Sequence, residues 1–185
     1  MLTNNINFIN FKLKKKKSNV RRNLNLILKE KNQVILSLSK EYKNNFNKKL
    51  IKFFKKKLDY RIIGMGGSSL GAQAIYDFLK NKIKKNFIFV DNLQGTKNKN
   101  IKEVFNNLVI SKSGNTIETI ANTNILVNKK DNNIFLTENK NSYLYLLAKK
   151  LKSEIIHHNN FIGGRYSVLS EVGMLPAELM NLNVS

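Results

Sequence analysis

From Tyr60 onward, short apolar runs alternate with segments of helical periodicity, and this alternation constrains the fold more than any other feature of the sequence. The apolar runs predict strands at residues 61–66, 86–92, 107–114, 132–139 and, as a weaker pattern, 153–158. The segments between them predict helices at residues 68–80, 100–107, 115–127 and 141–151. Strands that are apolar on both faces and are each followed by a helix indicate a parallel sheet covered on both sides. Because crossovers are right-handed, the expected fold is a doubly wound α/β domain of about five strands.

Residues 1–58 carry no strand pattern and differ from the rest of the chain. They begin with an irregular basic tail, and residues 18–58 place apolar side chains at roughly helical spacing, with a predicted break near Asn44. We therefore expect a basic tail and helical lead-in over residues 1–58, followed by a ligand-binding domain over residues 59–185. Near the end of the chain, Pro176 predicts the start of a helix, because proline is favoured in the first turn.

The absence of cysteine and of long apolar runs narrows the classes of protein to consider. Without cysteine the chain has no disulfide, no thiolate metal site and no cysteine nucleophile. No apolar run approaches the roughly 18 residues that a membrane span needs. We therefore expect a cytoplasmic protein with no membrane partner.

The net charge of +21 suggests a nucleic-acid partner as an alternative. The charge is nearly all lysine and is spread along the chain, and its densest run, Lys14–Lys17, is typical of a solvated segment. Specific binding of nucleic acid relies on arginine forks and stacked aromatic rings. The arginines are few: Arg21, Arg22, Arg61 and Arg165. We do not expect nucleic acid to be the main ligand, and binding through the lysines is left as an alternative to test.

The loop after the first predicted strand has the composition of an anion-binding turn. In parallel sheets of this kind ligands bind at the carboxyl ends of the strands, which directs attention to the loops after the first and third strands. The first loop, GMGGSSLG, begins at Gly64 and opens a helix. Its glycines let the backbone approach a ligand, and the helix start offers free N–H groups and a positive dipole end. Ser68 and Ser69 add hydroxyl groups, although a tight turn with a serine cap would show the same pattern.

The loop after the third predicted strand, SKSGNTIET, runs from Ser111 to Thr119 and also opens a helix. It holds four hydroxyl residues and a lysine around one glycine. Short hydroxyl side chains suit a tetrahedral dianion, and each hydrogen bond to a charged group contributes about 1.5–3 kcal/mol before ordering costs. A helix cap at Asn115 or Thr116 explains this loop alone. Two such loops on one sheet edge favour a phosphate pocket.

A dinucleotide site is the main competing interpretation, because Asp91 follows the second strand where a ribose-binding acid would lie. The glycine spacing does not match G-x-G-x-x-G, since position 69 is serine. A dinucleotide would also leave the SKSGNTIET loop without a role. The Walker A pattern of nucleotide-binding loops is absent from the sequence.

Four stretches, in family order, resemble the glucose-6-phosphate isomerase family, also called phosphoglucose isomerases. IGMGGSSLG is similar to the family's first phosphate loop, and SKSGNTIET to its second. FVDNLQGT resembles the segment after its second strand, and FIGGRYSVLSEVGML, at residues 161–175, resembles its VGGRxSxxSAVGLLP signature. The resemblance implies a sugar-isomerase (SIS) fold. It also implies interconversion of glucose 6-phosphate and fructose 6-phosphate through an enediolate, in glycolysis and gluconeogenesis, with no organic cofactor.

The resemblance also assigns roles to individual residues. Four hydroxyl side chains would hold the phosphate: Ser68, Ser111, Ser113 and Thr116. Lys112 would contribute its backbone N–H, and Gly67 would let the sugar approach the backbone. Gly164 and Arg165 would lie over the reacting carbons, where the guanidinium would stabilise the charge of the enediolate oxygens. A surface salt bridge is the alternative role for Arg165.

Family members are dimers, so the resemblance implies a homodimer that binds a hexose 6-phosphate, with mannose 6-phosphate left open as a second substrate. The chain departs from the family pattern at Ser113, where threonine is usual, at Asn115, where a second hydroxyl residue is usual, and at Glu171, where alanine is usual. These changes put the details of the phosphate contacts in doubt.

The family's catalytic glutamate, histidine and lysine lie downstream of the signature, in sequence that this chain lacks. Aldose–ketose isomerisation needs a general base, so we expect the chain alone to be inactive or nearly so, as for a truncated or split gene. The remaining candidates have structural roles in this interpretation: His157 and His158 at a strand end, and the carboxylates Glu118, Glu171 and Glu178. A non-catalytic sugar-phosphate-binding module on the same fold is the alternative function.

Overall fold

The structure of the chain is a computed structural model that describes residues 18–30, 32–94 and 104–184. Within these residues three helices precede the sheet: α1 (Ser18–Lys29), α2 (Gln33–Ser37) and α3 (Lys48–Phe54). The strands are β1 (Asp59–Gly64), β2 (Asn86–Val90), β3 (Asn106–Ile110), β4 (Asn132–Thr137) and β5 (Glu154–His157). The helices that accompany them are α4 (Leu70–Leu79), α5 (Ile117–Leu126), α6 (Tyr143–Leu151) and α7 (Glu171–Leu179). Short 3-10 turns are η1 (Gly66–Ser68), η2 (Lys80–Lys82) and η3 (Gly164–Tyr166).

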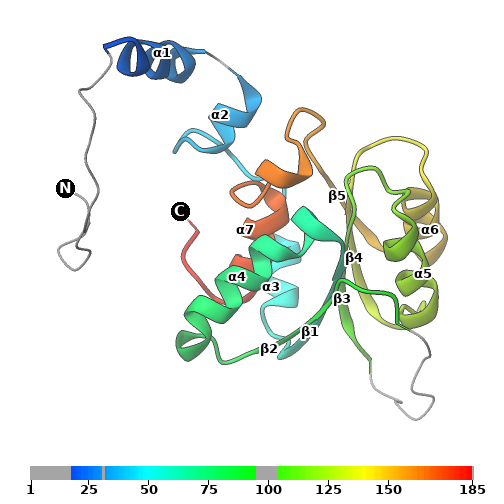
Figure 1. Cartoon of the computed structure of the whole chain (residues 1–185). Coiled ribbons are helices and arrows are strands. Elements are labelled where there is room, and N and C mark those ends of the chain that lie inside the picture. The colour runs from blue at the N-terminus through cyan, green and yellow to red at the C-terminus, as the bar shows by residue number, and fades with distance from the viewer. Residues whose placement is uncertain (1–17, 31, 95–103, 185) are drawn as a thin grey trace.

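The five strands form one sheet in the order β2-β1-β3-β4-β5 (Figure 1). Every neighbouring pair is parallel. Gly64, the last residue of β1, is paired with Ile110, the last residue of β3. The chain therefore leaves these two adjacent strands at the same edge of the sheet and at the same level.

Helices cover both faces of the sheet, with α3, α4 and α7 on one face and α5 and α6 on the other (Figure 1). Successive side chains of a strand point to opposite faces. Ile62 of β1 accordingly joins the core beneath α4 and α7, whereas Ile63 joins the core beneath α5 and α6. The predicted doubly wound α/β fold, preceded by helices, is confirmed.

Lys85, just before β2, connects the lead-in to the end of the chain. It is 5% exposed, and its ammonium donates to the carbonyl oxygens of Lys55 (2.8 Å) and Leu179 (2.7 Å). These carbonyls lie at the C-terminal ends of α3 and α7, where helix dipoles place partial negative charge. Burial, and then the charge of Lys55, lower the pKa of Lys85. One buried cation therefore holds two helix ends against the sheet.

The helix predicted at residues 100–107 is wrong at its C-terminal end. Part of the segment lies outside the described residues, but Asn106 and Asn107 begin β3 instead of ending a helix. Their amides are paired with the neighbouring strand: Asn107 donates to the Asn133 side chain, and Asn132 donates to the Asn106 side chain, both at 2.8 Å. Asparagine is unusual inside a strand, and these cross-strand bonds explain why it is accepted here.

Two helix predictions also need correction. Pro176 lies inside α7, which begins at Glu171 after the buried Ser170, so proline does not open this helix. The helix continues past it, because the Met180 N–H donates to the Pro176 carbonyl (2.9 Å). The lead-in predicted over residues 18–58 is divided into three short helices, and the predicted break near Asn44 is confirmed.

Candidate functional site

The order of strands changes direction between β1 and β3. From β1 the chain moves outward to β2, and from β3 it moves the opposite way to β4 and β5. Such a switch point leaves a crevice outside the carboxyl ends of the two strands, and ligands of open α/β sheets bind there. Both loops that the sequence singles out leave the sheet at this crevice.

The turn after β1 is shaped by glycines. Gly66 has φ +56°, a left-handed conformation that favours glycine. A Cβ at Gly64 would lie 3.0 Å from both the Ser68 Cβ and the Ile110 carbonyl oxygen, so Ser68 lies close over the ends of β1 and β3. The Ser68 hydroxyl has no hydrogen-bond partner among the described residues, whereas the buried Ser69 donates to the Gly66 carbonyl (3.4 Å). Ser68 therefore presents an unsatisfied hydroxyl at the crevice.

The turn after β3 is closed by hydroxyl groups. The Ser111 and Thr116 side-chain oxygens lie 3.1 Å apart in a hydrogen bond, and the Gly114 N–H donates to the Ser111 hydroxyl (3.2 Å). Gly114 has φ +67°, and a Cβ there would lie 2.0 Å from the Ser142 hydroxyl, so the turn requires glycine. Thr116 is the N-cap residue of α5, but its side chain makes no capping bond. The N–H groups that open α5 are therefore left without a side-chain cap.

Lys112 connects the second turn to the segment that carries the signature motif. Its ammonium donates to the Asn160 carbonyl (2.7 Å) and lies 3.6 Å from a carboxylate oxygen of Glu138. Glu138 also pairs with Lys140 at 2.5 Å. Burial acts to raise the pKa of Glu138, but the hydrogen bonds and charges of Lys140 and Lys112 together lower it. The Lys112 ammonium is thus already paired. This pairing does not affect the prediction for Lys112, which is that its backbone N–H binds the phosphate.

The signature turn folds back onto the first turn. A Cβ at Gly67 would lie 2.2 Å from the Gly164 carbonyl oxygen and 3.1 Å from the Arg165 nitrogen, so η1 and η3 touch through their backbones. Two hydroxyl bonds set the shape of the signature turn: Ser167 donates to the Gly164 carbonyl and Ser170 to the Ser167 carbonyl, each at 2.7 Å. Gly164 itself has open space where a Cβ would be.

Arg165 lies at the surface of the signature turn. It is exposed, and its guanidinium makes no hydrogen bond or ion pair within the part of the chain that the structure describes, so the salt bridge considered as an alternative is not formed there. Together with Gly67 and Gly164 it borders a groove of about 870 Å³ along α4. The rest of this groove is apolar, and Phe78 on its wall is 86% exposed. The sequence analysis missed this groove, although apolar residues on the outer face of the helix were a signal for it.

The structure therefore places all the predicted site residues on three turns at one sheet edge. The first turn carries Gly67 and Ser68, the second carries Ser111, Lys112, Ser113 and Thr116, and the third carries Gly164 and Arg165. Ser113 is exposed and accepts a hydrogen bond from the Asn115 N–H (3.2 Å). Gly95 and Thr96 of the FVDNLQGT stretch lie outside the described residues, as does Lys14–Lys17. The ligand-binding roles of these residues stay predictions.

A buried polar cluster beside the signature turn is a feature that the sequence analysis missed. Glu171 is 0% exposed and accepts hydrogen bonds from the Tyr42 hydroxyl (2.9 and 3.0 Å) and from the Asn45 N–H (3.0 Å). Burial, and then the hydrogen bond and charge of Glu171, raise the pKa of Tyr42. The departure from alanine at position 171 was the sequence signal for this cluster.

The histidines lie where the sequence predicts, with His157 at the end of β5 and His158 directly after it. His158 is buried, and burial lowers its pKa, while its hydrogen bond with the Asn159 carbonyl acts in the opposite direction.

Glu178 pairs with Lys55 at 2.6 Å. Within the described residues, no group of three or more histidine, aspartate and glutamate side chains is arranged to hold a metal ion.

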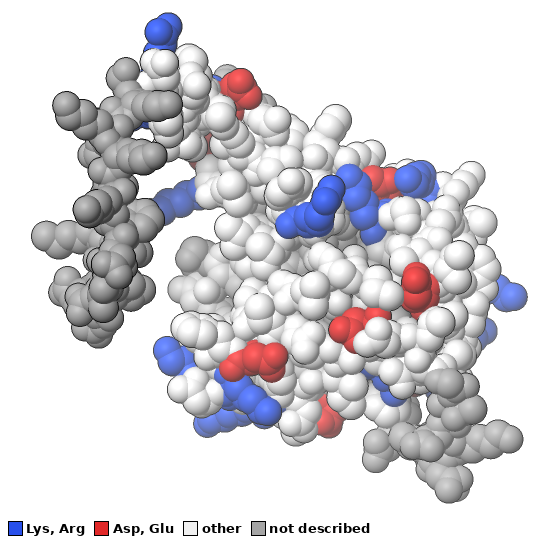
Figure 2. Space-filling view, in the orientation of Figure 1, with Lys and Arg blue, Asp and Glu red and all other residues white. Residues whose placement is uncertain are grey.

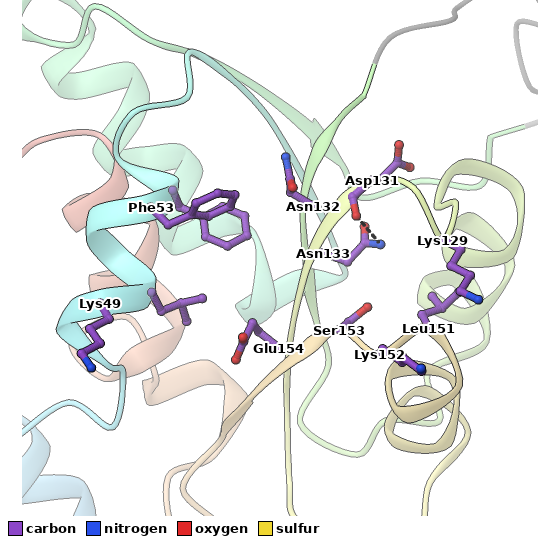
Figure 3. A pocket seen from close by; sticks show the side chains of 12 residues that line it. Lys49, Phe53, Lys129, Asp131, Asn132, Asn133, Leu151, Lys152, Ser153 and Glu154 are labelled. Atoms are coloured by element: carbon purple, nitrogen blue, oxygen red, sulfur yellow. Dashed lines mark hydrogen bonds between the residues drawn. The ribbon is translucent and has the colours of Figure 1, made fainter.

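A second hollow, of about 390 Å³, lies at the opposite edge of the sheet, where β4 and β5 begin (Figure 3). Lys49 and Phe53 of α3 line one side of it, and Lys152 lines the other. Asp131, also in its lining, already accepts a hydrogen bond from the Asn128 N–H (2.8 Å). Because this hollow is at the opposite edge of the sheet from the switch point and Asp131 in its lining is already engaged, we assign no ligand to it.

The face of the described residues that Figure 2 shows is not predominantly basic. Figure 2 shows lysine and arginine side chains scattered over the visible face, with acidic groups among them and no continuous band. The helices of the described residues include none that is long and apolar enough to cross a lipid bilayer.

Comparison with known proteins places the chain in a family. The model of the phosphoglucose isomerase family matches residues 31–182. The chain belongs to this family. Glucose-6-phosphate isomerase from Borreliella afzelii is 36% identical over 132 residues, which are 61% of this chain and 25% of the relative. The enzymes from Prochlorococcus marinus (37% over 142 residues, 66% of this chain and 26% of the relative) and Acholeplasma laidlawii (36% over 142 residues, 66% and 34%) are similar.

The chain thus spans about a quarter to a third of the length of these relatives of the phosphoglucose isomerase family. Solved structures agree with an SIS-like fold. A hypothetical protein from Thermus thermophilus has a TM-score of 0.65 at 21% identity, covering 90% of this chain and 44% of that one. Tagatose-6-phosphate ketose/aldose isomerase from Escherichia coli has a TM-score of 0.54 at 18% identity, covering 71% and 40%.

Proposed function

We propose that this phosphoglucose isomerase family member binds a hexose 6-phosphate at the crevice between β1 and β3. In this proposal it supplies the phosphate-binding part of a glucose-6-phosphate isomerase site. The observation that carries the proposal is the shared level of the two hydroxyl-bearing turns, since Gly64 is paired with Ile110. One dianion held between them would meet Ser68 on the first turn and Thr116 on the second.

The names of related proteins agree with this ligand class. The curated relatives are glucose-6-phosphate isomerases. The NanR protein of Vibrio vulnificus, with a TM-score of 0.50 at 19% identity, was solved with ManNAc-6P, and the match covers 73% of this chain and 53% of that one. The proposed binding unit begins at residue 59, and the lead-in helix α3 packs on the same core through Ile51 and Phe54.

In the proposed complex the phosphate oxygens accept hydrogen bonds from short donors. The hydroxyl donors are Ser68, Ser111, Ser113 and Thr116, and the Lys112 N–H adds a backbone donor. The opening of α5 has no side-chain cap, and the positive end of a helix favours an anion. Each hydrogen bond to the charged group is worth about 1.5–3 kcal/mol before ordering costs, so loss of one donor weakens binding measurably.

The sugar would extend from the phosphate over Gly67 toward the signature turn. Arg165 has no ionic partner among the described residues, so its guanidinium is free to stabilise charge on the enediolate oxygens. Isomerisation also needs a base to carry a proton between adjacent carbons. Two carboxylates near these turns are engaged, Glu138 by Lys112 and Lys140, and Glu171 by Tyr42 and Asn45. We therefore propose that turnover requires a base that these groups do not supply.

The engagement of Glu138 and Glu171 favours the second candidate, a sugar-phosphate-binding module without catalysis. As an isomerase, the protein would act in glycolysis and gluconeogenesis in the cytoplasm, as a homodimer and without an organic cofactor. The two candidates share the binding site and differ in turnover, so binding and turnover are tested separately.

Calorimetric titration with fructose 6-phosphate tests the binding site. We expect Ser68→Ala and Thr116→Val each to weaken binding about tenfold, the equivalent of one charge-assisted hydrogen bond at about 1.4 kcal/mol. Ser153→Ala, at the opposite edge of the sheet, is the matched control and keeps wild-type affinity. Wild-type affinity in both site variants, or no binding by the wild type, would contradict the proposal.

A coupled assay for glucose 6-phosphate production tests turnover by the same protein. We expect no rate above background from the purified chain, because Glu138 and Glu171 are both held by other groups and are therefore not available as the base. Turnover that Arg165→Ala abolishes would show that the chain supplies the complete chemistry and would overturn that expectation. The same result would also contradict the second candidate function, a sugar-phosphate-binding module without catalysis.

A further inference from the structure

A single buried carboxylate connects the lead-in chain with the signature turn. Glu171 is the first residue of α7, and its two oxygens meet donors from the irregular segment between α2 and α3, namely the Tyr42 hydroxyl and the Asn45 N–H. The carboxylate is fully buried, and its position in the first turn of a helix is one where the helix dipole favours negative charge. A buried charge is costly unless it is hydrogen-bonded, so this arrangement depends on both donors.

Tyr42 contacts the signature segment on both sides of the turn. Its hydroxyl bonds Glu171 after the turn and also interacts with the Asn159 side chain before it. Asn159 in turn accepts a hydrogen bond from the Phe161 N–H (2.9 Å) through its side chain. The Tyr42 hydroxyl therefore links Asn159, before the turn that carries Gly164 and Arg165, with Glu171 after it.

The chain between Glu171 and Arg165 has little freedom to absorb a displacement. Ser170 bonds the Ser167 carbonyl and Ser167 bonds the Gly164 carbonyl, which ties successive turns together. A Cβ at Gly173 would lie 2.0 Å from the Val168 carbonyl oxygen, so α7 also packs directly on this segment. Movement of Glu171 is therefore transmitted to the backbone of η3.

We propose that Glu171 and Tyr42 are positioning residues that hold the signature turn, and with it Arg165, against Gly67 of the first turn. The inference rests on the proposed function only where it concerns the bound sugar. The family signature that this segment resembles has alanine at position 171, whereas this chain has a hydrogen-bonded glutamate there. Tyr42 and Asn45 of the lead-in thereby help to shape the proposed site, although the lead-in supplies no ligand-binding side chain to it.

The test compares three conservative variants of the full chain. Glu171→Gln keeps the size of the side chain but removes its charge, and Tyr42→Phe removes one hydroxyl. Glu178→Gln is the matched control, because Glu178 lies on the same helix and pairs with Lys55 away from the signature turn. The readouts are the backbone amide resonances of Gly67, Gly164 and Arg165, and the affinity for fructose 6-phosphate.

We expect Glu171→Gln and Tyr42→Phe to shift the amide resonances of Gly164 and Arg165 and to weaken fructose 6-phosphate binding about tenfold. The control variant leaves both unchanged. Unshifted amide resonances in both variants would overturn the proposal, as would shifted resonances with affinity within about twofold of wild type. Loss of stability alone does not count in its favour. If Glu171→Gln fails to fold, Tyr42→Phe decides the question by the same two readouts.

The same experiment separates this inference from the proposed function. If the wild-type chain binds no hexose 6-phosphate, the proposed function fails. The amide resonances then decide by themselves whether Glu171 and Tyr42 position the signature turn.

Discussion

The contact between Gly67 and the signature turn gives the sharpest prediction for stability. In Gly67→Ala the new Cβ would lie 2.2 Å from the Gly164 carbonyl oxygen and 2.6 Å from its carbonyl carbon. These neighbours are backbone atoms, so no side chain can rotate to make room. Overpacking of this kind costs about 1–3 kcal/mol. For a chain of this length that corresponds to a fall in melting temperature of about 2–12 °C.

Gly164→Ala is the matched control, because it adds the same methyl group to the other partner of this contact. Nothing lies within 4 Å of a Cβ there, and the residue has no positive φ. An alanine that fits without strain stabilises a protein by about 0.4–1 kcal/mol through the unfolded state. Gly67→Ala is therefore expected to lower the free energy of unfolding and Gly164→Ala to leave it unchanged or raise it. Urea denaturation followed by circular dichroism measures both.

The sign of the difference between these variants decides the matter. Equal stability of the two variants would refute the direct backbone contact between η1 and η3. Fructose 6-phosphate titration of Gly67→Ala adds a functional readout, because relief of the clash has to move either η1 or the Arg165 turn. We expect its affinity to fall at least about tenfold.

Two further predictions concern buried basic side chains. Lys85→Met removes the donor that the Lys55 and Leu179 carbonyls share. We expect this variant to have a free energy of unfolding in urea that is lower by about 1–3 kcal/mol. A variant more stable than the wild type would contradict the role assigned to Lys85. Burial lowers the pKa of His158, so the unfolded chain takes up a proton first as the pH falls below about 6.5, and stability present above that pH is lost. As the pH is lowered from about 7.5 to 5, the urea midpoint should fall more steeply in the wild type than in His158→Gln. A smaller fall in the wild type would contradict the lowered pKa of His158.

The sheet and the two hydroxyl-bearing turns after β1 and β3 could be predicted because they depend on local patterns. Apolar runs of strand length give the sheet, and Gly66 and Gly114 adopt the left-handed conformations that turns at these places require. Strand order then follows from the family fold and from the rule of right-handed crossovers. These features place Ser68 and Thr116 at one edge without any knowledge of side-chain packing.

Features that depend on distant packing were not predictable in this way. Glu171 and Tyr42 are 129 residues apart, and no periodicity links them. Asn106 is a loop residue by propensity, but a hydrogen bond from Asn132 on the neighbouring strand satisfies it inside β3. Pro176 fits a helix start by propensity, but the serine-closed turn before Glu171 starts α7 earlier. For Glu171 and Asn106 a contact distant in the sequence decides the structure, whereas for Pro176 a second local feature, the turn closed by Ser170, outweighs its preference.

The position of the crevice between β1 and β3 has a consequence for the unfolding of the protein. The sheet there has a seam, with two strands on one side and three on the other, joined by a single parallel ladder. A phosphate bound to the turns after β1 and β3 would contact both parts of the sheet, and its release would be needed before the two parts could separate. If the proposed ligand binds there, mass action favours the folded chain, and unfolding in urea would need a higher denaturant concentration when fructose 6-phosphate is present.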